Sequence, residues 1–306
     1  MSERTKPAPH GWLLLDKPRG LGSTQAVGLV KRVLRQGGYR KTKVGHGGTL
    51  DPLAEGVLPI ALGEATKLAG RMLDASKIYD FTIRFGEQTD TLDTEGEVVV
   101  TSDLIPETED VAAILPAFTG AIQQAPPAYS AIKIDGKRAY DRARAGEEVE
   151  MKLRDTTIHS LDVLDSKAGA VTLRAHVSKG TYIRSLARDI ATALGSVGHV
   201  TYLRRIKAGP FTQEQAISLD SAEEIAKGAP LEHLLLPLEA GLDDIPVLHL
   251  DPDSAQAVRQ GRVLSELPQP DGLHMAKLGQ VPVALMELEG GSAKVVRGFN
   301  LPDVAE

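Results

Sequence analysis

Short apolar runs, some continuous and some alternating with polar residues, recur along the chain. Alternation places successive side chains on opposite faces of a strand, whereas a continuous apolar run is typical of a buried strand. A strand over residues 56–63 has a tight turn as its alternative, since Pro59 interrupts the run. The segment 129–137 is predicted to be a strand with an Asp-Gly turn. The remaining predicted strands cover residues 11–17, 77–85, 151–164, 170–177 and 198–207.

Helical spacing of apolar residues is clearest over residues 181–194, where one apolar stripe ends at Gly195. Three further helices are predicted, one after a cap at Ser23 or Thr24, one over residues 64–73 and one over residues 104–118.

Strands outnumber helices in this prediction, and hairpin signals are frequent. The pattern therefore favours an α+β fold, with a largely antiparallel mixed sheet and helices packed on it, over a parallel sheet. From residue 246 onward, short apolar runs are separated by Pro and Gly, which predicts a small β-rich domain at the end of the chain.

The composition is ordinary for a water-soluble globular protein, with 42% hydrophobic and 25% charged residues in a chain of 306. That length favours two domains. No apolar stretch approaches the length of a membrane span, and the start of the chain lacks the apolar core of a signal peptide. The absence of cysteine excludes disulfides, thiolate catalysis and Cys-based zinc sites. We expect a cytoplasmic protein.

The overall net charge of −6 conceals two unlike parts. Residues 214–306 carry 16 acids and 6 basic residues, a net charge of −10, so the rest of the chain carries +4. This shift in charge supports a domain boundary between residues 215 and 245. We predict a larger domain over residues 1–245 and the small β-rich domain over residues 246–306.

The most informative segment is the Gly-rich run at residues 45–53, which contains Asp51 followed by Pro52. Glycine permits a close approach of the backbone, and the proline biases Asp51 towards an extended conformation. The loop lacks the clustered oxygen ligands of a calcium site and the Lys-Ser or Lys-Thr ending of a phosphate loop. Nucleophilic or acid–base chemistry is one interpretation of Asp51. The other is a carboxylate that caps a helix or closes a turn.

A run of cations without any acid precedes this loop. Such a run indicates a phosphate-rich partner, although a solvated helix face is the alternative. The run consists of Lys17, Arg19, Lys31, Arg32, Arg35, Arg40, Lys41 and Lys43.

A second group of cations surrounds Asp189 and includes Arg184, in the first turn of the clearest predicted helix. A cation at that end opposes the helix macrodipole, which makes a carboxylate or phosphate partner plausible. A surface arginine that extends into solvent is the alternative. The other members of the group are Lys179, Arg188, Arg204, Arg205 and Lys207.

Three other residues have open interpretations from the sequence alone. Tyr79 is either a half-buried strand aromatic or a ring that stacks on an extruded base. His46 could be an acid–base group, a phosphate contact or a donor that stabilises the loop, and no cluster of ligands makes it a metal site. Asp93 is a turn acid unless Arg184 requires a partner.

Six motifs, in a fixed order over residues 11–207, resemble the bacterial tRNA pseudouridine synthase B family. The small C-terminal part resembles the PUA-like domain of that family only loosely, through residues 248–252 and 260–262. Gly47 stands where many members have a small hydroxyl residue. The motifs are Leu15-Asp16-Lys17-Pro18-Arg19-Gly20, the run from Gly45 to Leu58, Gly63-Glu64-Ala65-Thr66-Lys67, Tyr129-Ser130-Ala131-Ile132-Lys133, Ser178-Lys179-Gly180-Thr181-Tyr182-Ile183-Arg184 and Tyr202-Leu203-Arg204-Arg205.

The resemblance implies the isomerisation of uridine 55 in the TΨC loop of tRNA to pseudouridine, by base flipping and without cofactor or metal. It implies that Asp51 is the catalytic nucleophile and that Arg184 pairs with it and keeps it ionised. Tyr79 corresponds to the ring that stacks on the flipped base and helps to remove the C5 proton. His46 resembles the histidine that occupies the space left by the flipped nucleotide.

Further substrate-binding positions follow from the same resemblance: Lys17, Asp93, Lys179, Tyr182 and Leu203, with Asp93 as the acid that supports the arginine. The expected partner is the T arm of tRNA, bound by a monomer that needs no protein partner and no membrane. Two alternatives remain open. One is a guide-RNA-dependent pseudouridine synthase, and the other is a tRNA-binding or tRNA-folding chaperone without chemistry.

Overall fold

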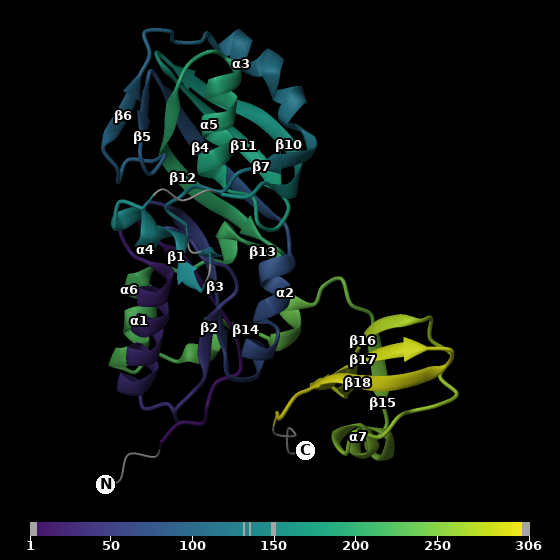
Figure 1. Ribbon diagram of the computed structural model, residues 1–306. Helices are drawn as coiled ribbons and strands as arrows, with labels where there is room; N and C mark the ends of the chain where they lie inside the picture. Colours follow the sequence, from purple (N-terminus) through teal and green to yellow (C-terminus); the bar gives the residue numbers. More distant parts are fainter. Residues whose placement is uncertain (1–4, 131, 135, 148–150, 302–306) are drawn as a thin grey trace.

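The computed structural model describes residues 5–130, 132–134, 136–147 and 151–301, and two separate sheets dominate it (Figure 1). The larger sheet has the strand order β14-β1-β3-β12-β4-β11-β10-β7, with β13 beside β12 and β2 beside β3. Among its described strands every pair is antiparallel except β3 with β12. Its strands are β1 (Gly11–Lys17), β2 (Val44–His46), β3 (Glu55–Leu62), β4 (Lys77–Phe85), β7 (Gly120–Gln124), β10 (Arg154–Lys167), β11 (Ala170–Val177), β12 (Gly198–Ala208), β13 (Phe211–Thr212) and β14 (Leu235–Leu236).

Helices cover the sheet at two places. The helix α5 packs on β12 and β4, with α3 beside it, whereas α1 packs against β2 and α6 at the other end of the sheet (Figure 1). The α-helices are α1 (Ser23–Gln36), α2 (Ala69–Asp74), α3 (Thr108–Ile114), α4 (Ala139–Arg144), α5 (Ile183–Ala193), α6 (Leu219–Glu224) and α7 (Pro252–Arg259). The 3₁₀ helices are η1 (Gly63–Lys67), η2 (Leu115–Phe118), η3 (Gln213–Gln215), η4 (Ile225–Lys227), η5 (Leu231–His233) and η6 (Leu238–Gly241).

The structure confirms the α+β prediction and most of the predicted strands. The pattern-based strands at 11–17 and 77–85 coincide with β1 and β4, and the segment 56–63 is the strand β3 rather than a turn. The predicted strand pair is the antiparallel pair β10 and β11. These segments were predictable because their inward positions carry apolar side chains at a regular spacing.

Several helix predictions need correction. The segment 64–73 is broken at Leu68 into η1 and α2, and the helix predicted over 104–118 begins only at Thr108 and ends as the 3₁₀ helix η2. The cap of α1 is Gly22, whose amide donates to the Gln25 side chain at 2.8 Å. The hydroxyl of Ser23 is engaged elsewhere, as described below.

The segment predicted as one strand over residues 129–137 lies partly outside the described residues, at positions 131 and 135. The described part contains two short strands, β8 (Lys133–Ile134) and β9 (Lys137–Arg138), which pair antiparallel. The predicted Asp-Gly turn includes position 135 and so lies partly outside the described residues. A second small hairpin joins β5 (Glu87–Thr89) to β6 (Val98–Thr101).

The C-terminal part forms its own four-stranded sheet of order β15-β16-β17-β18, as the β-rich prediction required (Figure 1). The helix α7 was missed, although Asp251 accepts a hydrogen bond from the Ser254 amide at 2.7 Å and Pro252 follows as the first helical residue. The division at residues 245 and 246 remains a prediction. The strands are β15 (Val247–Leu250), β16 (Gly272–Leu278), β17 (Val281–Glu289) and β18 (Ser292–Gly298).

The C-terminal sheet is joined to the larger part of the protein through a shared hydrophobic cluster that includes Leu238 and Leu242. Met275 and Leu285 belong to the same buried cluster as Trp12 and Leu14 of β1. Lys67 of η1 donates to the carbonyl of Gly298 at 2.8 Å.

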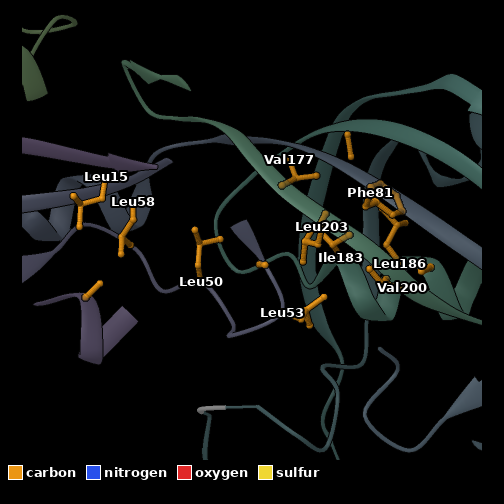
Figure 2. Packing of buried hydrophobic residues seen from close by; sticks show 14 of the residues in the cluster. Leu15, Leu50, Leu53, Leu58, Phe81, Val177, Ile183, Leu186, Val200 and Leu203 are labelled. Atoms are coloured by element: carbon orange, nitrogen blue, oxygen red, sulfur yellow. The ribbon is translucent and has the colours of Figure 1, made fainter. Parts of the chain in front are cut away.

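The main hydrophobic core lies between α5 and the central strands. Figure 2 shows Ile183 and Leu186 of α5 beside Phe81 of β4 and Leu203 of β12. Leu50, from the loop that carries Asp51, joins the same cluster and is 4% exposed. The Asp51 loop is therefore fixed to the core through its apolar members.

Candidate active site

The loop that carries Asp51 connects β2 to β3 and is held by hydrogen bonds on both sides of Asp51. The hydroxyl of Ser23 donates to the carbonyl of Leu50 and accepts from its amide, both at 2.8 Å. The amide of Gly20 donates to the carbonyl of Pro52 at 2.7 Å. These bonds fix the residues on both sides of Asp51, which explains why Ser23 is not a helix cap.

Arg205 anchors the same loop from β12. Its side chain is buried and donates to three backbone carbonyls, those of Val57 at 2.8 Å, Gly48 at 3.1 Å and Thr49 at 3.3 Å. The backbones of Arg205 and Gly56 also lie close together, since a Cβ on Gly56 would lie 2.3 Å from the carbonyl oxygen of Arg205. Sequence reasoning placed Arg205 in a cationic cluster and missed this structural role.

Lys17 lies behind the loop and is fully buried. Its Nζ donates to the carbonyls of Leu21 at 2.7 Å, Pro18 at 2.9 Å and Pro52 at 3.4 Å. Burial lowers the pKa of Lys17 to about 8, against the attraction of Asp51. The side chain holds the backbone around Asp51, and it is not among the residues that line the cavity described below.

Asp51 meets Arg184 in an ion pair. Oδ2 of Asp51 lies 2.8 Å from Nη2 of Arg184, and Nη1 of the same guanidinium lies 3.1 Å from Oδ2 of Asp93. The guanidinium also donates to the carbonyls of Thr91 at 2.9 Å and Tyr129 at 3.0 Å. The buried cation at the start of α5 therefore has two carboxylate partners, which offset the unfavourable helix macrodipole.

Asp93 is itself fixed by its surroundings. Its Oδ1 accepts hydrogen bonds from the Thr91 hydroxyl at 2.6 Å and from the Glu95 amide at 2.9 Å, and its side chain is 1% exposed. Asp93 therefore orients Arg184 from the buried side of the guanidinium. The structure thus brings the three residues together as the resemblance implied.

The start of α5 is tied to the end of β7. The amide of Tyr182 donates to the Gln124 side chain at 2.8 Å, and the hydroxyl of Ser185 donates to the carbonyl of Ala125 at 2.8 Å. These bonds satisfy a free amide at the helix N-terminus and fix the direction of the first turn, where Arg184 lies.

Asp51 and Arg184 open onto a cavity of about 320 Å³. Tyr79 of β4 and Leu203 of β12 form one part of its wall, and Tyr182 at the start of α5 forms another. Burial raises the pKa of Tyr182. The wall combines these aromatic and aliphatic side chains with the carboxylate of Asp51 and the cationic groups of Arg184, Arg205 and Lys77. Such a wall suits a planar polar ring that stacks and is held at its edges.

A second buried lysine was not identified from the sequence. Lys77 of β4 lines the cavity and donates to the carbonyls of Ala75 at 2.5 Å, Leu73 at 2.8 Å and Met72 at 2.9 Å, at the end of α2. Burial lowers its pKa to about 8, and the charge of Arg205 adds to this. Lys77 therefore fixes the end of α2 that borders the cavity.

Besides the buried Lys17 and Asp93, two further predicted residues, His46 and Lys179, lie outside the cavity wall. His46 lies on β2 opposite Ile60, where burial lowers its pKa, and its Nδ1 has no hydrogen-bond partner in the described part of the chain. Lys179 is exposed at the rim and forms an ion pair with Asp74 at 2.9 Å, which connects the loop after β11 to α2. Neither has a contact with Asp51.

Over the residues that the structure describes, no group of three or more His, Cys, Asp or Glu side chains could hold a metal ion. No helix within the same described ranges is long and apolar enough to span a membrane.

Comparisons with known proteins agree on one family. A model described as "TruB family pseudouridylate synthase (N terminal domain)" matches residues 32–183, and one described as "tRNA pseudouridylate synthase B C-terminal domain" matches residues 184–243. The tRNA pseudouridine synthase B of Novosphingobium aromaticivorans is 67% identical over 97% of this chain and 99% of its own. The chain belongs to the TruB family of pseudouridylate synthases.

Other members and solved structures extend this result. The tRNA pseudouridine synthase B of Zymomonas mobilis is 59% identical over 96% of this chain and 97% of its own. A chain in a solved H/ACA RNP bound to a substrate RNA containing 2'-deoxyuridine is 25% identical, with a TM-score of 0.71 over 96% of this chain and 86% of that one. The predicted pseudouridine synthase fold with a small PUA-like C-terminal domain is therefore correct.

Proposed function

We propose that this TruB family member converts uridine 55 in the T arm of tRNA into pseudouridine. The observation that carries the proposal is the Asp51–Arg184 pair at 2.8 Å, which opens onto a cavity lined by Tyr79, Tyr182 and Leu203. The relatives that are 67% and 59% identical are both tRNA pseudouridine synthases B.

In this proposal Asp51 is the nucleophile, and the bond that its carboxylate forms with the ribose or with the base breaks again before the product leaves. The bond between C1' of the ribose and N1 of uracil breaks, the base rotates within the cavity, and C1' bonds to C5. The C5 proton is lost and N1 gains a proton, so the reaction is an isomerisation that needs no oxidant, reductant or group donor. We propose that the enzyme uses neither cofactor nor metal.

The other side chains divide the remaining tasks. Arg184 offsets the desolvation of Asp51 when a base covers it, and Asp93 holds Arg184 in place. Tyr79 stacks on the flipped base and assists removal of the C5 proton, while Leu203 and Tyr182 enclose its other sides. Stacking compensates for the few kcal/mol that extraction of the base from the RNA costs.

The remaining predicted residues act at the edge of this site. Lys17 maintains the backbone that presents Asp51, and Lys179 meets the RNA backbone at the rim. His46, the last residue of β2, occupies the space that the flipped nucleotide vacates. The enzyme acts in the cytoplasm as a monomer, without a protein partner.

The test is to incubate the purified protein alone with an unmodified tRNA transcript and to map pseudouridine in the product. Pseudouridine at position 55 and nowhere else is expected. If no pseudouridine forms without a guide RNA, the proposal fails in favour of a guide-dependent synthase. If tRNA binds but is not modified under any condition, the protein is a binding or folding factor.

A further inference from the structure

The acid-free run of cations between residues 17 and 43 has two separate locations in the structure. Lys17 is buried behind the Asp51 loop, and Nη2 of Arg19 donates to the hydroxyl of Thr94 at 2.5 Å. The later cations lie at the far end of α1 and in the loop that follows it (Figure 1). Only the first two can belong to the active site.

We define the distal basic patch by its exposed cations in this second location. None of them forms an ion pair with another residue in the described ranges, whereas Arg32 on the same helix pairs with Glu223 at 3.4 Å. The patch consists of Lys31, Arg35, Arg40, Lys41 and Lys43.

The length of α1 separates this patch from the catalytic carboxylate. Ser23, the first residue of α1, bonds to Leu50 beside Asp51, and the helix runs for 14 residues to Gln36. At a rise of 1.5 Å per residue, the far end of α1 lies roughly 20 Å from the first turn. Lys31 lies eight residues after Ser23, about 12 Å along the helix, and the other members of the patch lie near its far end or in the loop that follows.

The loop after α1 holds its cations in a fixed arrangement. Tyr39 is buried and its hydroxyl accepts from the Leu231 amide at 3.1 Å. The backbone of Lys6 donates to the carbonyl of Gly38 at 2.9 Å and accepts from the Arg40 amide at 3.0 Å, and its Nζ lies 4.7 Å from the Tyr39 ring centre. A partner would meet these charges without having to order the loop.

Local structure explains only part of this charge. Arg35 lies in the last turn of α1, where a cation complements the helix dipole. Lys31, one turn earlier, and Lys41 in the loop have no such reason to be basic. The neighbouring acids Glu223 and Glu232 contact Arg32 and Tyr39 and leave the patch uncompensated. A concentration of unpaired cations in a chain of net charge −6 indicates a polyanionic partner.

We propose that the distal basic patch binds phosphates of the tRNA outside the T arm, as a second contact roughly 20 Å from the catalytic site. This inference rests on the proposed function, because it takes the same tRNA as the ligand. Binding at the patch adds affinity for the whole tRNA and leaves the chemical step unchanged.

The test compares two substrates, a full-length tRNA transcript and an isolated hairpin that contains only the T stem and loop. The variant K31Q/R35Q/R40Q/K41Q removes four cations while it leaves the loop backbone and Tyr39 in place. Lys227→Gln is the matched control, because Lys227 is exposed but already paired with Glu224 at 2.7 Å. Dissociation constants are measured over a series of salt concentrations, and the rate of pseudouridine formation is measured at saturating RNA.

The fourfold variant should bind full-length tRNA at least tenfold more weakly, with a salt dependence flatter by about 3 in the log–log slope. Its affinity for the hairpin and its rate on either saturating substrate should match those of the wild type and of Lys227→Gln. An unchanged affinity for full-length tRNA, or an equal loss with the hairpin, would overturn the inference. If the wild type modifies neither RNA, the proposed function fails instead, whatever the affinities are.

Discussion

The carboxylate of Asp51 and the guanidinium of Arg184 meet at 2.8 Å on the boundary between the cavity and the protein interior. The Arg184 side chain is 7% exposed, whereas that of Asp51 is 40% exposed. The pair therefore joins a fixed, buried cation to an anion that a substrate can reach. Asp93 binds the guanidinium from the buried side and so holds it in place when a substrate contacts Asp51.

The exposed position of Asp51 predicts that its charge matters for chemistry far more than for folding or binding. Asp51→Asn retains an oxygen that can accept from Arg184 but removes the nucleophile. We expect pseudouridine formation to fall by more than about 1,000-fold while the dissociation constant for tRNA changes by less than about threefold. Single-turnover rates and binding isotherms on the same tRNA would measure both. Turnover near that of the wild type would remove Asp51 from the mechanism.

The buried position of Asp93 predicts that its charge, unlike that of Asp51, matters strongly for folding. Asp93→Asn keeps the shape of the side chain but takes one of two anions away from a buried arginine. We expect the free energy of unfolding to drop by about 3 kcal/mol, with a lower catalytic rate and similar tRNA affinity. Urea unfolding and single-turnover kinetics would test this.

Asp244→Asn serves as the control for Asp93→Asn. Asp244 pairs with Arg71 at 2.9 Å, but its side chain is 66% exposed, so its loss should cost less than about 1 kcal/mol. Equal destabilisation by the two variants would show that the buried Asp93–Arg184 pair contributes no more to the free energy of unfolding than an exposed ion pair does.

The hydrogen bonds of Arg205 predict that it positions the Asp51 loop. Arg205→Lys keeps a positive charge but cannot reach the carbonyls of Gly48, Thr49 and Val57 with a single ammonium group. We expect a loss of about 1–3 kcal/mol in the free energy of unfolding and a lower kcat with a nearly unchanged KM. Arg204→Lys, at the neighbouring and more exposed position, is the control. An unchanged kcat in Arg205→Lys would contradict a positioning role.

The contrast between Asp51 and Arg205 shows what the sequence could reveal. Asp51 was identifiable because a Gly-rich loop and the surrounding motif are local in sequence. Arg205 was not identifiable as a loop anchor, since its partners are about 150 residues away and are backbone carbonyls, which every residue has. The strands were predictable for the same reason as Asp51, because the spacing of their apolar residues is also local in sequence. It could not show the parallel contact of β3 with β12, which brings this arginine to the loop.

Short helices were harder to predict than strands. The helix predicted over 104–118 starts late because Pro106 disfavours a helical conformation at Ile105, and Glu107 becomes the N-cap of α3. The apolar spacing of the segment did not show this start. The second basic group likewise separated in space, because Arg204 faces Asp16 and Glu55 while Arg205 is buried. A charge cluster in the sequence does not specify on which side of a strand each member lies.

The buried lysines predict an unusual dependence of stability on pH. Burial lowers the pKa of Lys77 from 10.5 to about 8 in the folded protein. Between these two values the unfolded chain binds more protons than the folded one, so the contribution of Lys77 to the free energy of unfolding rises with pH. Below pH 8 both states are protonated and the contribution is constant at its least favourable value.

Lys77→Met isolates this contribution. Urea unfolding at pH 7.5, 9 and 10 should show the wild type gaining stability relative to Lys77→Met as the pH rises. Lys17, with a pKa also about 8, titrates in both proteins and cancels from the difference. A difference that is flat or that falls with pH would show that Lys77 is not desolvated in the folded state.

Gly47, in the loop between β2 and β3, lies directly against Met72 of α2. A Cβ on Gly47 would lie 2.7 Å from Cβ of Met72 in α2, so any larger residue must displace the helix. We expect Gly47→Ser to lower the free energy of unfolding by about 1–3 kcal/mol, as overpacking does. Gly45→Ser is the matched control, because a Cβ there meets no atom within 4 Å.

A double-mutant cycle with Met72→Gly tests whether this contact is the cause, because only glycine removes the Cβ that the new side chain would meet. Met72→Gly alone should cost roughly 3–6 kcal/mol, because it leaves a cavity beside the loop and places a glycine in α2. If Gly47 and Met72 are coupled as the structure shows, Gly47→Ser should cost much less in the Met72→Gly background, with an interaction energy of at least about 1 kcal/mol. Additive costs would mean that the helix gives way freely and that the glycine is required for another reason.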